Sequence, residues 1–277
     1  MNWDKIFAIA RKDLREVQQN KAAWIPMIIV PVIFVLAIPL GVLLSMQYLP
    51  MSAADLASEM QDLQSYLEMM PAGLRQELAG LPVDQASVVL FLGYFFAPMF
   101  LIMPLMFSTV IAAESFAGER ERQPMGALLY TAPTDTELFL GKVAAALIPS
   151  LLISLASFGL YAIVLNVGGY PVMGRIWFPL ASWWPLMLWI TPGLAMLGIS
   201  ATVLISARTQ TFMGAYQTSA SLVLIVVLLM AGQAAGVLFL SVLVGMLLGL
   251  VVWIAAGLLT VVAIRSFNRS RLLESNA

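Results

Sequence analysis

Residues 117–142 read AGERERQPMGALLYTAPTDTELFLGK and interrupt a chain that otherwise consists largely of long apolar runs. The stretch combines charged side chains, two prolines and a short apolar segment. The whole chain has 277 residues, of which 61% are hydrophobic and only 10% are charged. A soluble domain carries about a quarter charged residues, so this composition places the chain in a membrane.

The apolar runs on either side of this stretch can be counted as membrane spans. A helix needs about 20 apolar residues to cross the hydrocarbon core. Four uncharged intervals of 29 to 33 residues suit one span each, and they are 22–54, 85–113, 143–174 and 176–207. The fifth interval, 209–264, would measure about 84 Å as one helix, so we divide it at Gly232-Gln233-Ala234-Ala235-Gly236. The sequence therefore predicts an all-α membrane protein with six transmembrane helices.

The predicted segments form one transmembrane domain. In chain order they are an interfacial helix at 1–21, span 1 at 22–46, an external helical loop at 47–87, span 2 at 88–113, a cytoplasmic loop at 114–142, span 3 at 143–166, span 4 at 183–205, span 5 at 212–232, span 6 at 240–264 and a cytoplasmic tail at 265–277.

Basic residues predict the orientation of the spans. An even number of spans puts both termini on one side, and all lysines and arginines except Arg75 and Arg175 fall on that side. Because basic residues favour cytoplasmic loops, we expect a multi-pass protein of the cytoplasmic membrane with both termini in the cytoplasm. Trp177, Trp183 and Trp184 are then expected at the outer interface, where amphipathic rings settle.

The N-terminal residues predict an amphipathic helix that lies in the cytoplasmic interface. Its apolar stripe consists of Trp3, Ile6, Phe7, Ala10, Leu14 and Val17. Its cations face lipid headgroups, so membrane lipid is a predicted partner. The alternative is that its polar face also contacts a cytoplasmic protein. The predicted interfacial anchors are Trp3, Phe7, Arg11, Lys12 and Leu14.

The external loop is predicted to form a small helical cap. Its apolar residues follow helical spacing, whereas Pro71 and Pro82 divide it into short helices. Its carboxylates are Asp55, Glu59, Asp62, Glu68, Glu77 and Asp84, against the single cation Arg75. They could attract cations, although a solvated acidic face is the commoner outcome.

The opening stretch itself predicts two helix ends. The helix of span 2 is expected to continue to about Arg122, because Gln123 precedes Pro124 and a residue before proline avoids helical geometry. The run Thr134-Asp135-Thr136-Glu137 has the spacing of a capping box and starts the helix of span 3.

A short helix between these ends has one apolar face. Pro124 suits its first turn, and Met125, Leu128 and Leu129 lie together on that face. A helix too short to cross the membrane must bury such a face on lipid or on another protein. The neighbouring charges offer ion-pair partners to a soluble protein.

At these residues the chain resembles the ABC-2 type permeases, the membrane subunits of ABC exporters. The motifs that carry the resemblance are Gly118-Glu119-Arg120-Glu121, Ala127-Leu128-Leu129-Tyr130-Thr131-Ala132-Pro133, Glu137-Leu138 and Gly141-Lys142. The run from Ala10 to Glu16 is similar to the family's elbow helix, and Ser206-Ala207-Arg208 with Gly232-Gln233 is similar to a sodium-exporter-like subgroup. One departure is Pro124-Met125-Gly126, where many members have Gly-Thr-Leu-Glu.

The resemblance implies the permease subunit of an ATP-driven exporter, with a coupling helix in the loop 114–142. It implies a homo- or heterodimer of permease chains, each seated on an ABC ATPase subunit. The implied ATPase-coupling residues are Glu119, Arg120, Glu121, Arg122, Met125, Leu128 and Leu129. Gly141-Lys142 lacks the rest of a phosphate loop, so we expect no catalytic activity and no bound cofactor in this chain, with ATP and Mg on the partner. No nucleic-acid partner is expected.

Three other functions stay open at this stage. An ion-coupled secondary transporter or channel would use Asn166, Tyr216, Gln217 and Gln233 as a polar path. An intramembrane enzyme would need a nucleophile and a base, yet the chain has no histidine or cysteine. The third is a membrane anchor that recruits an ATPase but does not itself transport. For the cargo, apolar spans favour a hydrophobic molecule, whereas the acidic loop and the subgroup likeness favour sodium.

Overall fold

The computed structural model of the chain describes residues 3–48, 53–78, 80–122, 135–209 and 211–266, which are mainly helical with no strand among them. Six helical stretches are long and apolar enough to cross a membrane, and they are Lys21–Tyr48, Val83–Arg122, Glu137–Gly168, Trp183–Ser206, Phe212–Ala234 and Val242–Arg265. The predicted all-α fold with six candidate spans is therefore confirmed.

Most spans are built from several helical segments in series, some of them π-helical and labelled η. Span 1 contains α2 (Lys21–Pro31), η1 (Val32–Ala37) and α3 (Ile38–Tyr48). Span 2 contains α6 (Val83–Val88), η2 (Val89–Phe95), α7 (Ala97–Phe100), α8 (Ile102–Ala113), η3 (Glu114–Gly118) and α9 (Glu119–Arg122). Span 3 is α11 (Asp135–Gly168), and span 4 contains α13 (Trp183–Pro185), η4 (Leu186–Ile190) and α14 (Thr191–Ser206). Span 5 contains α15 (Phe212–Ala220) and α16 (Val223–Ala234), and span 6 is α17 (Val242–Ser266).

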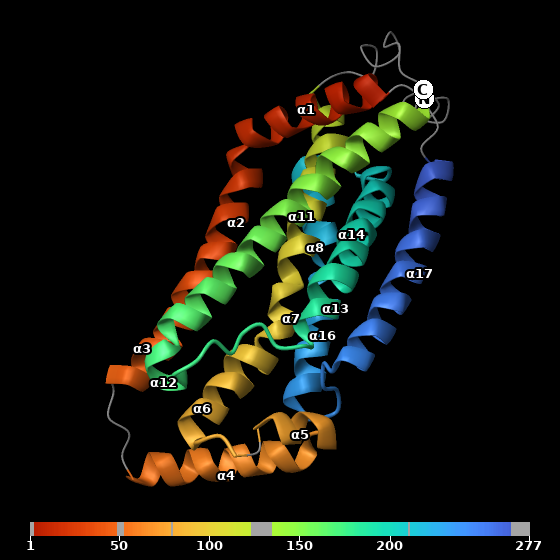
Figure 1. Cartoon of the computed structure of the whole chain (residues 1–277). Helices are drawn as coiled ribbons and strands as arrows, with labels where there is room; N and C mark the ends of the chain where they lie inside the picture. Colours follow the sequence, from red (N-terminus) through yellow and green to blue (C-terminus); the bar gives the residue numbers. More distant parts are fainter. Residues whose placement is uncertain (1–2, 49–52, 79, 123–134, 210, 267–277) are drawn as a thin grey trace.

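The remaining helices lie at the two ends of the bundle. Helix α1 (Trp3–Gln19) runs across one end, where α17 also finishes, and α4 (Ala53–Met69) and α5 (Ala72–Leu78) lie across the other end (Figure 1). The short α12 (Tyr170–Met173) follows span 3. We call the end with α1 and α9 the charged end, and the end with α4 and α5 the cap end.

Span 2 runs through the middle of the bundle, and Pro98 interrupts its backbone hydrogen bonding. Proline has no N–H, so it cannot donate to Tyr94 as in an α-helix or to Gly93 as in a π-helix. Just after η2, the Phe96 N–H bonds the Phe91 carbonyl, 2.9 Å away. Pro98 therefore removes the donor that the Tyr94 carbonyl would have in an α-helix, and the carbonyls of residues 92–94 also accept hydrogen bonds from other spans.

Side chains from three other spans donate these bonds. The Tyr161 hydroxyl of α11 donates to the Leu92 carbonyl at 2.8 Å. The Trp183 indole N–H of α13 donates to the Gly93 carbonyl at 2.7 Å. The Gln233 amide of α16 donates to the Tyr94 carbonyl at 2.7 Å. Because a buried backbone carbonyl without a partner is costly, these bonds fix spans 3, 4 and 5 around span 2.

Trp183 is part of the core, so the prediction that it anchors the outer interface is wrong. Its side chain is fully buried. Its ring lies edge-on to Phe100 and Phe178, with centroids 5.1 and 4.8 Å away. It also stacks against Tyr161 at 5.4 Å. Its neighbour Trp184 is half-exposed, which agrees with an interfacial position.

Two amides that were candidates for a polar path hold the fold together instead. Gln233 bonds the Tyr94 carbonyl, and the Asn166 side chain bonds the backbone of the segment before span 4. Its oxygen accepts from the N–H groups of Trp177 and Phe178, and its nitrogen donates to the Phe178 carbonyl at 2.7 Å. Both amides therefore satisfy backbone groups of neighbouring segments.

We predict that Tyr161→Phe lowers the free energy of unfolding by about 1–3 kcal/mol, because it removes a buried hydrogen bond to the Leu92 carbonyl. Thermal unfolding of the purified chain in detergent measures the effect. Tyr170→Phe is the matched control, because Tyr170 is 58% exposed. Equal stability of the two variants would contradict a role for the Tyr161 hydroxyl.

Candidate functional site

At the charged end, α1 packs closely against the beginning of α11. A Cβ added to Gly141 would lie 2.9 Å from the Ile9 side chain and 3.2 Å from the Ile6 carbonyl, so only glycine permits this approach. The face of α1 turned toward the bundle carries Ile6, Ala10, Asp13 and Val17, and all four are buried. Three of these residues are apolar, so Asp13 brings a carboxylate into an otherwise apolar contact.

Lys142 of α11 lies opposite Asp13 and is itself only 3% exposed. Its Nζ atom is 2.5 Å from Glu119 Oε2, 2.5 Å from the Ser115 carbonyl and 3.4 Å from Asp13 Oδ2. It also lies 5.4 Å from the centroid of the Phe116 ring. A buried ammonium needs partners of this kind, because the desolvation of an isolated charge is very costly.

Glu119 links α1 with α11, the helix that follows the 123–134 segment. Its second oxygen, Oε1, is 2.5 Å from Lys12 Nζ, and Lys12 is also 3.3 Å from Glu16 one turn further along α1. The carboxylate of α9 therefore bridges a lysine of α1 and a lysine of α11. We call Lys12, Asp13, Glu119 and Lys142 the lysine–carboxylate cluster.

Two groups of α1 in this cluster have shifted pKa values. Burial raises the pKa of the Asp13 carboxyl, because desolvation disfavours its charged form more than Lys142 stabilises it. Burial alone would lower the pKa of Lys12, but its hydrogen bond to Glu119 and the charges of Glu119, Glu16 and Asp13 together outweigh that effect, so the pKa is raised. Lys12 therefore stays charged at neutral pH.

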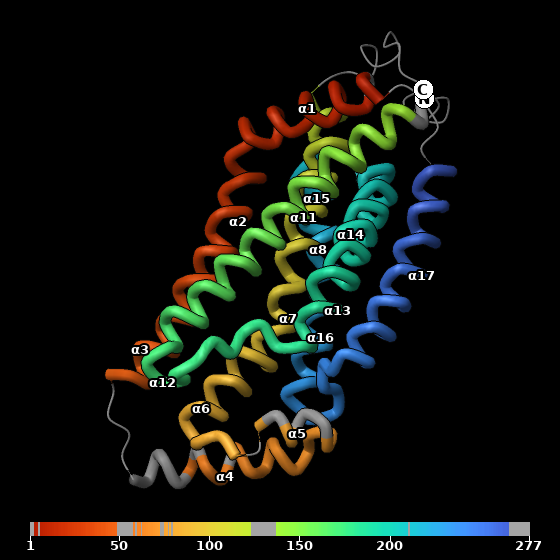
Figure 2. Tube along the Cα trace, viewed as in Figure 1, coloured from red at the N-terminus to blue at the C-terminus, as the bar shows by residue number. Residues whose placement is uncertain are grey.

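A second group of polar contacts fixes the bend between α1 and α2 to η3 and α9. The Asn20 side-chain oxygen accepts from the Ala22 N–H at 3.1 Å and so caps α2. The Asn20 amide nitrogen donates to Glu114 Oε2 at 2.7 Å. Glu114, which is buried, also forms an ion pair with Arg122. Figure 2 shows α1 turning into α2 at this bend.

Residues 120 and 121 bind the junction between spans 4 and 5. Arg120 donates to the carbonyl of Ser206, the last residue of α14, at 2.8 Å. Glu121 accepts from the Phe212 N–H at 2.8 Å, at the beginning of α15. A carboxylate is favourable there, because the first N–H groups of a helix lack internal partners.

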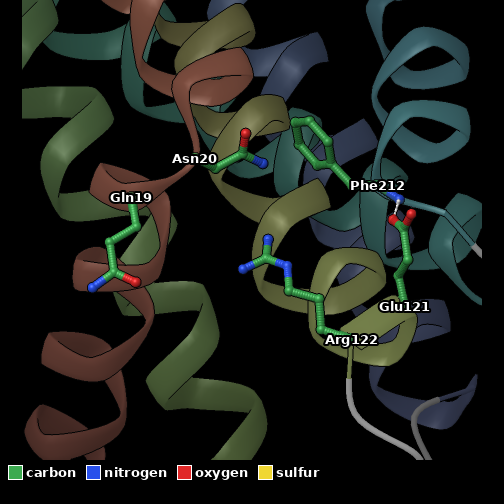
Figure 3. Close-up of a pocket in the computed structure, with 5 residues that line it drawn as sticks. All are labelled: Gln19, Asn20, Glu121, Arg122 and Phe212. Atoms are coloured by element: carbon green, nitrogen blue, oxygen red, sulfur yellow. Dashed lines mark hydrogen bonds between the residues drawn. The ribbon is translucent and has the colours of Figure 1, made fainter.

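An open pocket of about 360 Å³ lies between the α1–α2 bend, α9 and the start of α15. Figure 3 shows Gln19 and Asn20 on one side and Glu121 and Phe212 on the other, with the Arg122 side chain extending between them. The pocket is lined by two amides, a carboxylate and a guanidinium. It borders directly on the residue at which α9 ends.

The structure places each described residue of the predicted coupling set within this network. Glu119 is buried and paired with two lysines, whereas Arg120, Glu121 and Arg122 contact Ser206, Phe212 and Glu114. These four residues therefore have partners within the chain itself. Met125, Leu128 and Leu129 lie outside the described residues.

The predicted interfacial anchors divide between two faces of α1. Trp3 and Phe7 are each 61% exposed and point away from the bundle. Arg11 is also exposed, and Leu14 is half-buried. Lys12 is turned toward the cluster and paired with Glu119. The apolar stripe of the sequence thus serves two purposes, because Ile6, Ala10 and Val17 pack on the protein.

Sequence reasoning missed Asp13, Glu114 and Lys142 as members of a site. The burial of Asp13 was predictable in part, because Asp13 lies three residues after Ala10 and four before Val17 on one helical face. The burial of Lys142 was less predictable, although Lys142 lies four residues after Leu138 on a buried face of α11. That the two would face each other depends on how α1 crosses α11.

Six candidate spans around a buried core, with short helices at both ends, define a multi-pass membrane protein. Among the described residues, the densest network of buried charges lies where spans 2 and 3 approach the 123–134 segment. The family model of the ABC-2 family transporter protein matches residues 7–246, so the chain belongs to that family and is a membrane permease of an ABC transporter.

The family implies an ABC ATPase partner and a dimeric arrangement in general. The match is to the family as a whole and does not distinguish a sodium-exporter-like subgroup. No curated protein and no solved structure matched the chain.

We predict that Lys142→Met destabilises the chain by about 3–5 kcal/mol, because it leaves the buried Asp13 and Glu119 carboxylates without their shared cation. Lys12→Met is the matched control: Lys12 also pairs with Glu119, but its side chain is 47% exposed. The control should lose at most about 1 kcal/mol. Denaturation midpoints in detergent compare them, and equal losses would show that burial of Lys142 is unimportant.

The raised pKa of Asp13 predicts a pH dependence. A group whose pKa is higher in the folded than in the unfolded chain loses its contribution as the pH rises through the folded value. Starting from the ordinary value of 3.8, the stability of the wild type relative to Asp13→Asn should therefore fall with rising pH. Unfolding midpoints of both chains between about pH 3.5 and pH 7 test this. A constant difference would contradict the raised pKa.

Proposed function

We propose that this chain is the permease of an ATP-driven exporter and that its charged end receives motion from an ATPase on the cytoplasmic side. The observation that carries the proposal is the attachment of both ends of the 123–134 segment to the rest of the bundle. Glu119 and Lys142, one on each side of that segment, bind each other at 2.5 Å and share α1 as a neighbour.

The network connects this segment with five of the six spans. Span 1 is reached through Asn20 and Glu114, and the segment itself joins spans 2 and 3. Spans 4 and 5 are reached through Arg120 on the Ser206 carbonyl and Glu121 on the Phe212 N–H. A displacement at the segment therefore has a polar connection to each of these spans, as rigid-body coupling requires.

In this proposal the apolar face of Met125, Leu128 and Leu129 binds a groove on the ATPase, and ATP and Mg²⁺ bind the ATPase alone. The charged residues before this face mainly contact other helices of the permease. Glu119 is buried, and Glu121 accepts from an N–H at the start of α15. Half-exposed Arg122 lies in the open pocket and is the member of the set best placed to meet a partner side chain. We also propose that both termini face the cytoplasm, in agreement with the distribution of lysine and arginine.

The rival secondary transporter has less support from the structure. Two of its four candidate path residues, Asn166 and Gln233, are bound to backbone groups. Among the described residues, the buried charges lie on α1, η3, α9 and the beginning of α11, at one end of the bundle. ATP-driven motion delivered at that end uses the observed network, whereas an ion-coupled path through the spans does not.

Leu128→Asp tests the proposal, because a carboxylate on the apolar face should prevent docking of the ATPase. We expect loss of co-purification with the cognate ATPase and loss of ATP-dependent transport, while the permease itself still inserts and folds. Ala127→Asp is the matched control, since it adds the same charge beside that face. Normal assembly and transport in Leu128→Asp would show that the segment does not couple the two proteins.

A further inference from the structure

A cleft at the cap end is not used by the proposed coupling. It has a volume of about 500 Å³ and lies between α3, α4, η2 and the end of α16. Its walls are mainly apolar, with Val42 and Met46 from α3 and Leu90, Phe91 and Phe95 from η2. Small-molecule sites usually have volumes of roughly 300–1,000 Å³, so the cleft is large enough for a ligand.

The cleft is continuous with the part of the surface that faces the bilayer. Its walls α3, η2 and α16 all belong to candidate membrane spans. Phe91, which lines the cleft, is 45% exposed, and Leu44 on α3 is 49% exposed. Exposed apolar side chains on membrane spans meet lipid acyl chains, so an acyl chain can enter the cleft from the bilayer without crossing water.

The wall formed by η2 is held in a defined position. The carbonyls of residues 92–94 bond Tyr161, Trp183 and Gln233, so the neighbouring Leu90, Phe91 and Phe95 cannot easily shift to close the space. The ring of Tyr66 from α4 meets Phe95 edge-on, with centroids 5.3 Å apart. An apolar space with fixed walls is the kind of site that an apolar chain fills at low entropic cost.

The polar side of the cleft indicates which headgroup fits. Tyr66 and Ser87 bring the only hydroxyl groups among its lining residues. The α4 helix beside it carries four acidic residues in its sequence and no basic one, against one cation, Arg75 of α5, which donates to the Glu68 and Met70 carbonyls. An anionic headgroup would be repelled by this helix, whereas the ammonium of a zwitterionic headgroup would be attracted.

From these observations we propose that the cleft binds one acyl chain of a zwitterionic membrane phospholipid, with its headgroup beside α4. The site goes beyond the coupling function and requires neither the ATPase nor transport. Its ligand enters from the bilayer, and its walls come from spans 1, 2 and 5 together with the cap.

Native mass spectrometry of the full-length chain in detergent tests the proposal, with phosphatidylethanolamine and phosphatidylglycerol of identical acyl chains as probes. We expect one phosphatidylethanolamine to bind more tightly than phosphatidylglycerol. Ala234→Phe should weaken that binding about 15-fold, because each buried methylene contributes close to a factor of four and the ring displaces about two. Ala231→Phe is the control, since Ala231 is exposed on the same helix and does not line the cleft.

Several outcomes would overturn the proposal. Equal binding of the two lipids by the wild type would exclude selection by α4, whatever the folding of Ala234→Phe. Equal weakening by both phenylalanine variants would exclude the cleft as the binding site. Efficient disulfide formation between two copies of Phe91→Cys in membranes, in a chain without native cysteine, would show that a second permease covers the cleft. None of these results bears on the coupling role of Leu128.

Discussion

The arrangement of the bundle depends on the backbone of span 2 beside Pro98. A proline within an apolar span leaves carbonyl oxygens that no water can reach, and each such group is costly without a donor. Here the Gly93 and Tyr94 carbonyls, together with that of Leu92, bind side chains of spans 3, 4 and 5. Three polar side chains from distant parts of the sequence thus converge on the turn of helix just before Pro98.

The charged end follows the same physical rule with stronger interactions. Lys142 and Glu119 are both nearly inaccessible to solvent, so their charges persist only because each has several partners. Their bonds join α1, α9 and α11 where spans 2 and 3 approach the 123–134 segment. In the coupling that we propose, this geometry is the route by which a soluble ATPase moves several spans together, without a charged relay through the membrane.

The two ends of the molecule differ in chemistry. At the charged end, buried ion pairs hold the helices in one arrangement, and the adjacent open pocket is polar. At the cap end, an acidic helix lies over an apolar cleft that faces the bilayer. We infer that the first end suits a soluble protein partner and the second suits a lipid. The rigid η2 segment forms one wall of the lipid-facing cleft and belongs to the same span as Glu119.

Sequence alone determined the number of spans, the amphipathic α1 and the helix breaks near Pro71, Pro82 and Gly236, because hydropathy, periodicity and proline chemistry are local properties. It also predicted residues 119–122 as ATPase-coupling residues, which stays a prediction. Only the tertiary structure decided that Trp183 is buried, that Gln233 bonds the Tyr94 carbonyl and that Asp13 faces Lys142. Those partners lie far apart in the sequence, so their pairing depends on how helices cross and pack, which no local pattern specifies.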